Sequence, residues 1–212
     1  MQRLSILLVC LLLQACSATT KSLGSSLWHS IAGDDGVQLT DDDIQNMRYA
    51  SQYMSINNGP QLFVVLAYDE NGQQKWVTQD RVTIATQNGR VVKTVGLGDN
   101  LQQVTNLADD PLAKANQIID GAGWTRQMAW TEHQQVRMAT ARSTFSWDGN
   151  DTLKVGSSVT PVRVLNEEIT AAGKSWSNRY WVDNEGHIRQ SKQYIGPDYW
   201  PITTVLLKAA KE

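Results

Sequence analysis

The sequence contains few of the residues that build metal sites and disulfide bridges. Only two of its 212 residues are Cys, and both of them, Cys10 and Cys16, lie at the start of the chain. The three His residues, His29, His133 and His187, are too far apart to form a zinc-ligand motif. We therefore expect no disulfide, no metal site and no cofactor in the folded part of the protein.

The sequence also lacks an excess of one charge sign and an apolar segment long enough to span a membrane. The chain has 19 Lys and Arg against 21 Asp and Glu, which gives a formal net charge of −2. This balance provides no basic surface for nucleic acid. The apolar run of residues 4–13 is shorter than the ~20 residues that a helix needs to cross a bilayer. With 41% hydrophobic residues, the sequence instead predicts a globular chain.

The first residues resemble a bacterial lipoprotein signal. Residues 4–13 have the length of a signal peptide's hydrophobic region. They run into Leu13–Cys16, with the sequence Leu-Gln-Ala-Cys, which resembles the lipobox. In a lipobox the small residue before Cys gives the signal peptidase access to the bond, and the thiol takes a diacylglyceryl group. We predict that residues 1–15 are a signal peptide and that Cys16 carries the lipid.

Lipid attachment at Cys16 would determine where the rest of the chain works. Ser17, rather than Asp, follows this residue, which in enteric-type bacteria implies transfer to the outer membrane. Acyl chains stabilise such anchoring by ~0.8 kcal/mol per buried methylene. We expect residues 16–39 to be the lipidated Cys and a flexible tether, and residues 40–212 to be one β-rich domain that faces the periplasm. An ordinary signal peptide cut after Ala18, which leaves no lipid, is the alternative.

Short apolar segments separated by turn signals predict an all-β, mostly antiparallel fold. Asn71-Gly72 and Asn88-Gly89 are hairpin signals, because a type I′ turn needs positive φ at two successive residues. We expect about ten strands in one barrel-like or strongly curled sheet, with one or two short helices. The clearest strands are expected at residues 62–68, 75–78, 81–86, 90–95, 123–130, 135–147, 160–170, 175–183 and 187–195.

Other segments depart from this strand pattern. Thr40 precedes the acidic run Asp41–Asp43, which suits the N-terminal end of a short helix, and the alternation that a calcium loop requires is absent. Residues 97–122 combine an Asp-Asp-Pro sequence with helix-like apolar spacing, so we expect a loop and one short helix there. Asp148–Asp151 contains a Gly-Asn pair and is expected to be a turn between two strands.

Motifs spread over most of the mature chain resemble those of one protein family. The motifs are Arg48–Ser51, Asn58–Leu66, Trp76–Asp80, Gly89–Thr94, Gly96–Leu97, Asn178–Asp183 and Gly186–Gln193. They are similar to those of the YjbF/GfcB family of capsule and exopolysaccharide lipoproteins. The resemblance implies an outer-membrane lipoprotein with a β-rich, barrel-like domain. It also implies polysaccharide-export proteins as partners, including an outer-membrane barrel, and it carries no enzymatic activity over to this chain.

No pair of residues in the sequence has the spacing of a catalytic site. Glu167 and Glu168 are adjacent in an expected strand, so their side chains point to opposite faces and cannot form an acid/base pair. Arg48 and Arg90 are expected to pair with carboxylates inside or at the rim of the barrel, with an acidic sugar as the alternative partner. We therefore predict that the protein is not an enzyme.

Tryptophan is abundant, with eight Trp against two Phe. Indole rings fill β cores and also stack on sugars. Six of them are expected mainly in the core, namely Trp76, Trp124, Trp130, Trp147, Trp176 and Trp181. Tyr199 and Trp200 lie outside the expected strands and are the candidates for ligand contact. We expect at least one of these two to be solvent-accessible, and burial of both would remove them as candidates.

These features together predict a non-enzymatic outer-membrane lipoprotein that assists capsule or exopolysaccharide secretion. It would dock export proteins in the periplasm, and direct contact with the polysaccharide is left open. Two other classes stay open as alternatives. One is a β-barrel that carries a lipid or another apolar ligand, which would require a large apolar cavity. The other is a glycan hydrolase or deacetylase, which would require two convergent carboxylates or a metal cluster in a cleft.

Overall fold

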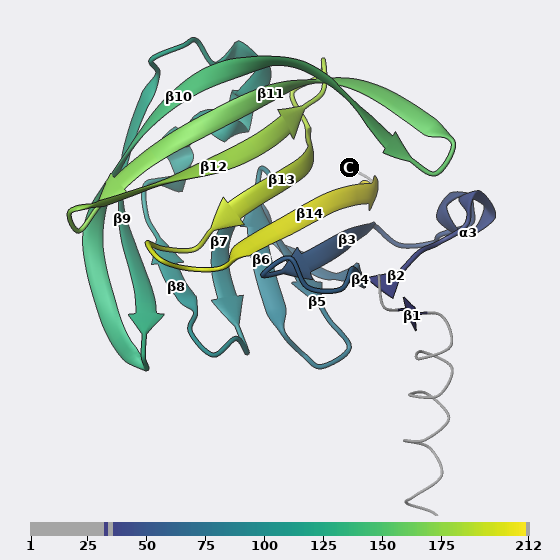
Figure 1. Ribbon diagram of the computed structural model, residues 1–212, viewed down its shortest axis with the longest axis horizontal. Helices are drawn as coiled ribbons and strands as arrows, with labels where there is room; N and C mark the ends of the chain where they lie inside the picture. The colour runs from purple at the N-terminus through teal and green to yellow at the C-terminus, as the bar shows by residue number, and fades with distance from the viewer. Residues whose placement is uncertain (1–31, 34–35, 211–212) are drawn as a thin grey trace, which may run out of the picture. The chain divides into compact units, whose positions relative to one another are not determined.

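A computed structural model describes residues 32–33 and 36–210, and the chain divides into two compact units, Met1–Gln38 and Leu39–Glu212. In the first unit, two short strands form a two-stranded antiparallel sheet. These strands are β1 (Ala32–Gly33) and β2 (Gly36–Val37). The second unit consists mainly of one antiparallel sheet of twelve strands (Figure 1), so the predicted all-β, mostly antiparallel, barrel-like class is confirmed.

The large sheet curls until its two edge strands approach each other. Its strand order is β7-β6-β5-β4-β3-β14-β13-β12-β11-β10-β9-β8. Between the edge strands, the Leu101 N–H donates to Thr94 Oγ1 at 2.9 Å, so the barrel is nearly closed. The strands are β3 (Ser51–Ile56), β4 (Leu62–Glu70), β5 (Gln73–Val77), β6 (Thr83–Gln87), β7 (Arg90–Val95), β8 (Leu101–Val104), β9 (Gly123–Glu132), β10 (Gln135–Val155), β11 (Ser158–Ala171), β12 (Lys174–Val182), β13 (Ile188–Tyr194) and β14 (Pro201–Lys208).

Successive strands are antiparallel, so their turns alternate between the two ends of the barrel. The β4–β5, β6–β7, β10–β11 and β12–β13 turns lie at one end, together with the C-terminal end of β14. We call this end the β12–β13 end. The opposite end, called the β13–β14 end, carries the β3–β4, β5–β6, β9–β10, β11–β12 and β13–β14 turns. Functional residues on turns therefore separate into two groups.

Both Asn-Gly hairpin signals form the expected turns. Asn71 and Gly72 have φ values of 54° and 75°, and Asn88 and Gly89 have values of 49° and 78°. These are the two successive positive φ angles that a type I′ turn requires. They join β4 to β5 and β6 to β7, and the predicted strand at residues 90–95 matches β7 at both ends.

The strands differ from the prediction in several places, and β3 and β8 were not among the expected strands. The turn expected at Asp148–Asp151 is wrong, because β10 continues to Val155 and takes up a bulge between Trp147 and Asn150. The positive φ of 81° at Gly149 lies within this bulge, which explains the misleading turn signal. The sequence did not indicate strand β14. This strand pairs with both β13 and β3, so the C-terminal part of the chain lies beside the first strand of the large sheet.

The helical segments are short. Thr40 caps helix α3 (Asp41–Gln45) as predicted, since its Oγ1 accepts from the Asp43 N–H at 3.2 Å. In place of a loop with one helix, residues 97–122 contain strand β8 and two 3-10 segments, η1 (Leu107–Asp109) and η2 (Pro111–Gln117). Among the described residues, no helix has the length and apolar character that crossing a bilayer requires.

The inner face of the sheet holds an apolar core with a polar centre. The largest fully buried apolar side chains include Phe145, Met54, Ile84 and Leu165. Of the six Trp expected in the core, Trp76, Trp124 and Trp130 are at most 4% exposed, and Trp147, Trp176 and Trp181 are half-buried. Buried beside them are the charged residues Arg90, Arg126, Asp110 and Glu167. The interior therefore contains ionised groups that must be paired within the protein.

We predict that Gly89→Ala destabilises the fold more than Gly72→Ala does. Both glycines have positive φ, so both substitutions cost about 1–2 kcal/mol in backbone strain. A Cβ at Gly89 would also lie 2.5 Å from Cβ of Ile188, whereas a Cβ at Gly72 has no neighbour within 4 Å. The overlap adds about 1–3 kcal/mol for Gly89→Ala. Urea unfolding followed by Trp fluorescence measures both values.

The Gly72→Ala variant is the matched control, because both glycines hold the same position in an Asn-Gly turn. Equal free energies of unfolding for the two variants would contradict the contact between the β6–β7 turn and Ile188.

Candidate functional site

Four charged side chains meet inside the barrel. They come from separate parts of the chain, with Arg90 on β7, Arg126 on β9, Glu167 on β11 and Asp110 at the start of η2. Arg90 binds both oxygens of Asp110, with Nε–Oδ2 at 2.6 Å and Nη2–Oδ1 at 3.1 Å. Its Nη1 donates to Glu167 Oε2 at 2.8 Å, and Arg126 Nη1 lies 3.3 Å from Glu167 Oε1. Two positive and two negative charges leave this cluster neutral.

Neutral side chains complete the hydrogen bonding of Glu167. The Tyr180 hydroxyl donates to Oε2 at 2.8 Å, and the Ser143 hydroxyl donates to Oε1 at 2.6 Å. The indole ring of Trp124 contacts both arginines, with its centroid 4.4 Å from Cζ of Arg90 and 4.2 Å from Cζ of Arg126. We call Arg90, Asp110, Arg126, Glu167, Tyr180, Ser143 and Trp124 the buried network. Cation–π contacts and hydrogen bonds to charges are strong where water is excluded.

The buried network is electrostatically unsuited to acid/base catalysis. Burial alone would raise the pKa of Glu167, but Arg90, Arg126 and the hydroxyl of Ser143 lower it to about 2. Burial is also the main reason why the pKa of Tyr180 lies well above its ordinary value of 10.0. Glu167 has no exposed surface, and Glu168 is exposed on the other face of the strand, as predicted. Glu167 is therefore a structural group that is ionised at neutral pH and has no access to a substrate.

A cleft of about 800 Å³ opens at the β12–β13 end of the barrel. Its walls come from the β4–β5 and β6–β7 turns, η2, the start of β13 and the C-terminal part of β14. Five amide side chains line it, namely Gln52, Gln74, Asn88, Asn116 and Gln117. The charged lining residues are two acids, Asp69 and Glu185, two bases, Lys114 and Arg189, and His187. Polar residues outnumber apolar ones in this lining, but the two kinds contribute nearly equal surface, and the formal charges of the lining residues balance.

Gln52 has an uncommon environment at this cleft. It projects from β3 to the inner face, and its register partners are Val64 and Leu206. The residue is only 5% exposed, yet its Nε2 has no hydrogen-bond partner among the described residues. An unpaired buried donor costs about 1–3 kcal/mol, so such a group needs an explanation.

A chain of polar side chains connects the cleft to the buried network. Thr204, which lines the cleft, lies 2.8 Å from Ser191 through their hydroxyl oxygens. Gln193 donates from Nε2 to Ser191 Oγ at 2.9 Å, and its Oε1 lies 3.3 Å from the Tyr180 hydroxyl. Tyr180 in turn donates to Glu167. The polar interior therefore reaches from the floor of the cleft to the charged centre of the barrel.

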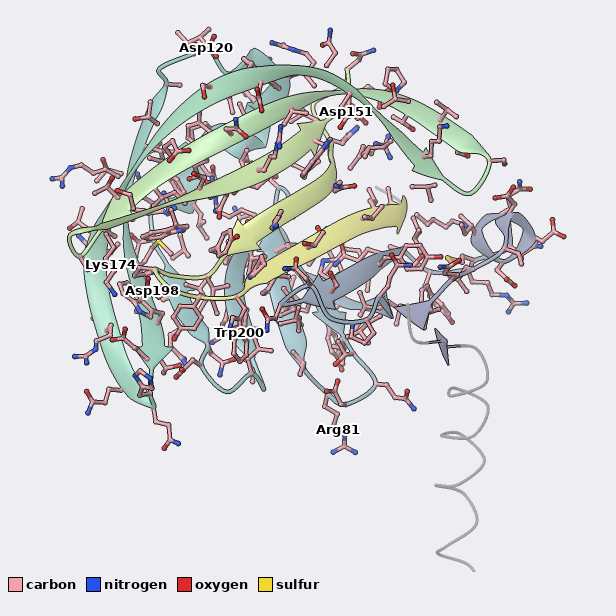
Figure 2. The ribbon with its side chains drawn as sticks, viewed as in Figure 1. Arg81, Asp120, Asp151, Lys174, Asp198 and Trp200 are labelled. Atoms are coloured by element: carbon pink, nitrogen blue, oxygen red, sulfur yellow. The ribbon has the colours of Figure 1, made fainter. Side chains whose placement is uncertain are left out.

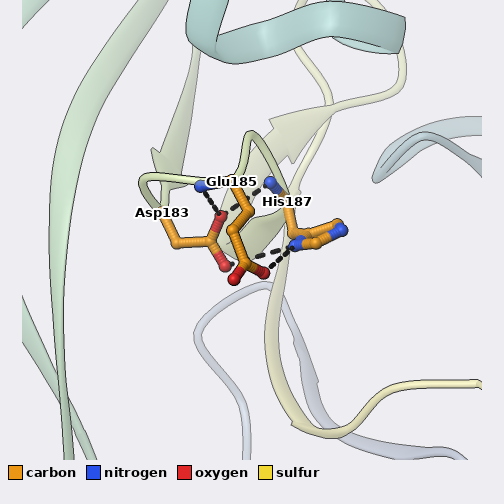
Figure 3. Close-up of side chains that lie close together, drawn as sticks. All are labelled: Asp183, Glu185 and His187. Carbon is orange, nitrogen blue, oxygen red and sulfur yellow. Dashed lines mark hydrogen bonds and ion pairs between the residues drawn. The ribbon is translucent and has the colours of Figure 1, made fainter.

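The turn before β13 brings three groups with potential metal ligands together, Asp183, Glu185 and His187 (Figure 3). Asp183 Oδ1 accepts from the backbone N–H groups of Glu185 at 3.0 Å and His187 at 2.9 Å. Its Oδ2 accepts from Arg189 Nε at 2.5 Å. Burial raises the pKa of Asp183, but the bonds from His187 and Arg189 outweigh this effect and lower it. Because a metal ion would have to displace the Arg189 guanidinium, we assign Asp183 to the turn.

A family model for the group 4 capsule polysaccharide lipoproteins GfcB and YjbF matches residues 24–207. The chain belongs to this family. It is 68% identical to the uncharacterized lipoprotein YjbF of Escherichia coli (strain K12), over the full length of both chains. It is 38% identical to the uncharacterized lipoprotein GfcB of the same strain, over 99% of this chain and 100% of that one. None of these names denotes an enzyme.

The fold of this family member also matches a solved structure. The crystal structure of the hypothetical lipoprotein YmcC from Escherichia coli (K12) has a TM-score of 0.78 and 38% identity to this chain. The match covers 93% of this chain and 100% of that one. The resemblance inferred from the sequence motifs is therefore confirmed, together with the barrel-like architecture that it implied.

The two aromatic candidates lie at the β13–β14 end, away from the cleft. Trp200 is 63% exposed, so the expected accessibility is confirmed (Figure 2). Tyr199 is half-buried, and burial raises its pKa to about 12. Their role as ligand contacts stays a prediction. Cys16, the predicted lipid site, and His29 lie outside the described residues.

The structure confirms one predicted pairing and adds residues that the sequence did not indicate. Arg90 pairs with carboxylates inside the barrel as expected, whereas Arg48 is exposed. The amides of the cleft were not predicted, because they come from β3, β5, the β6–β7 turn and η2 and share no motif. In the sequence, Asn88 was recognised only as a turn residue, and Gln52 gave no signal.

We predict that Glu167→Gln lowers stability by about 3–5 kcal/mol at neutral pH, because it leaves the buried Arg90 and Arg126 without one of their two counter-charges. The wild type should also lose stability in acid. The folded-state pKa of Glu167 is about 2, below the ordinary value of 4.5, so its contribution is complete above pH 4.5 and is lost as the pH falls toward 2. This loss amounts to about 3 kcal/mol. Denaturant unfolding between pH 7 and pH 2 measures both effects.

The control is Glu168→Gln, the adjacent residue on the exposed face. We expect it to leave both the stability at pH 7 and the acid profile close to those of the wild type. If wild type and Glu167→Gln lose stability in parallel between pH 5 and pH 2, Glu167 is not the group that couples folding to protons.

Proposed function

We propose that this protein is a non-enzymatic accessory lipoprotein of capsule or exopolysaccharide secretion. It is anchored through Cys16 to the inner leaflet of the outer membrane, and its barrel docks polysaccharide-export proteins in the periplasm. Membership of a capsule polysaccharide lipoprotein family across residues 24–207 is the observation that carries the proposal. The export partners include an outer-membrane barrel.

The geometry of the interior supports a docking module over a carrier of apolar ligands. A carrier needs a large apolar cavity within its barrel. In the described chain, the centre of the barrel is occupied by the buried network and by packed aromatic residues such as Trp130 and Phe145. The cleft is open at one end, and its lining mixes polar and apolar groups in nearly equal surface. Binding on the outer surface or at the barrel end therefore fits these residues better than storage of a lipid.

The same geometry favours a non-enzymatic role. A hydrolase or deacetylase needs two convergent carboxylates or a metal in an accessible cleft. The paired carboxylates of Asp110 and Glu167 are buried and bound to Arg90. In the accessible turn, Asp183 is held by two backbone N–H groups and Arg189. The Asp110, Glu167 and Asp183 carboxylates therefore support structure, and this favours a non-enzymatic role.

We predict that Cys16→Ala abolishes lipidation and releases the protein from the outer membrane. The wild type should incorporate labelled palmitate, fractionate with outer membranes and yield a mature N-terminus at Cys16. The variant should lose the label, because the thiol that accepts the diacylglyceryl group is gone. Mass spectrometry of the mature chain and sucrose-gradient fractionation measure these outcomes.

Cys10→Ala is the matched control, since it removes the other Cys from the predicted hydrophobic region and should leave lipidation unchanged. A mature wild-type chain that starts at Thr19 without lipid would establish the ordinary signal peptide instead and contradict the anchor.

Docking is tested separately in cells that make the polysaccharide. We predict that crosslinking followed by purification of the lipidated wild type recovers proteins of the export machinery, and that Cys16→Ala recovers much less of them. The reason is that anchoring confines the barrel to the membrane that holds the partners, which raises their effective concentration. Repeated absence of export proteins from the crosslinked wild type would refute the docking role.

A further inference from the structure

We propose that the cleft at the β12–β13 end binds an uncharged segment of a polysaccharide chain, with Gln52 as a hydrogen-bonding group in its floor. The inference rests on the proposed role in polysaccharide secretion, and it adds the site and the chemical class of the ligand. The ligand is a run of neutral sugar units that presents hydroxyl groups to the amides and C–H faces to the apolar parts of the cleft.

The amide side chains provide the first reason. A carboxamide offers two N–H donors and a carbonyl acceptor on one planar group, which matches hydroxyls that both donate and accept. Gln52, Gln74, Asn88, Asn116 and Gln117 bring five such groups to one cleft. Three of them, Asn88, Asn116 and Gln117, are exposed to a ligand that enters from solvent, and Asn116 Nδ2 already donates to the Asn184 carbonyl oxygen at 3.3 Å.

The unpaired donor of Gln52 is a second and independent observation. The side chain is 95% buried, lines the cleft and has no protein acceptor for Nε2 among the described residues. Neighbouring polar groups on the same inner surface are paired, as Thr204 is with Ser191 and Trp76 is with Thr86. A ligand hydroxyl in the cleft supplies the missing acceptor, and the soft terminal torsion of Gln lets the amide turn toward it.

The charge of the cleft selects a neutral ligand. The acids Asp69 and Glu185 are matched by the bases Lys114 and Arg189, and Arg189 is already bound to Asp183. A site for an acidic sugar would need an excess of available guanidinium or ammonium groups, because a buried or half-buried anion requires a partner. The balanced set here can instead hydrogen-bond neutral hydroxyls.

Shape and apolar surface agree with this ligand. The volume of about 800 Å³ lies within the range of ~300–1,000 Å³ that is typical of small-molecule sites, so a few sugar units fit within the cleft. The apolar side chains of Leu112, Ile188 and Leu206 also line it and can cover the C–H faces of a sugar ring. Because one end is open, a longer polymer can enter and leave.

Isothermal titration calorimetry tests the site on the purified full-length protein in detergent. The probes are neutral gluco-, galacto- and manno-oligosaccharides of four to eight units, with oligogalacturonates of the same length as acidic probes. We expect at least one neutral probe to bind and no acidic probe to bind as tightly. Gln52→Met should weaken binding of that neutral probe by at least about tenfold, as expected for one lost hydrogen bond to a buried group.

Gln52→Met is chosen because Met has a similar shape and no polar atom that needs pairing. If Nε2 serves only a ligand, the variant should unfold at the same or a higher urea concentration than the wild type, because an unpaired buried donor has been removed. A purely structural Gln52 would make the variant less stable. Gln79→Met, on an exposed turn at the opposite end, should change neither binding nor stability. Asn116→Ala should also weaken binding, since Asn116 lies on the accessible wall of η2.

Several results would overturn the inference. The inference fails if no neutral probe binds or if the oligogalacturonates bind more tightly than the neutral probes. It also fails if Gln52→Met and Asn116→Ala leave the affinity for the neutral probe unchanged, or if Gln52→Met lowers the free energy of unfolding. None of them bears on membrane anchoring or on recovery of export proteins by crosslinking. Calorimetry therefore tests the glycan site, and crosslinking tests the docking role, so either one can fail without the other.

Discussion

The ion pairs of Arg90 with Glu167 and Asp110 are the constraint on which the barrel depends. A fully buried carboxylate is tolerated only if it is paired and hydrogen-bonded, and Glu167 obtains its partners from β7, β9, β10 and β12. A shift of one residue in the register of β11 would place Glu168 inside and Glu167 outside. The network therefore penalises wrong registers across the sheet strongly, although a buried ion pair adds little net stability in itself.

The same network explains why ligand binding would occur at the end of the barrel and not in its centre. The guanidinium groups of Arg90 and Arg126 and the ring of Trp124 fill the space that a carrier would leave empty. The polar surface continues through Tyr180 and Gln193 toward the cleft. Residues near the cleft thus border an interior in which the carboxylates are paired, and Gln52 Nε2 is one of the few buried donors among the described residues that have no partner.

Local signals predicted the parts of the fold that depend on neighbouring residues. The two Asn-Gly turns, the Thr40 cap and the opposite directions of Glu167 and Glu168 all follow from backbone geometry within a few residues. Strand β8 was missed because its buried residues, Leu101 and Val104, are three apart and its pairing with β9 is irregular, which imitates helical spacing. The candidate site was missed for a related reason, since its amides are contributed by separate elements that only the closed sheet brings together.

Antiparallel order also separates the two surfaces that are candidates for recognition. Trp200 lies in the β13–β14 turn and Gln52, on β3, lines the cleft at the β12–β13 end, so they lie at opposite ends of the barrel. The buried network lies inside the barrel, and its ion pairs bind β7, β9 and β11 to one another. A substitution at either surface therefore leaves the other intact, because changes at sites that are far apart and share no partners act independently. This geometry allows one end to contact a protein while the other holds a sugar chain.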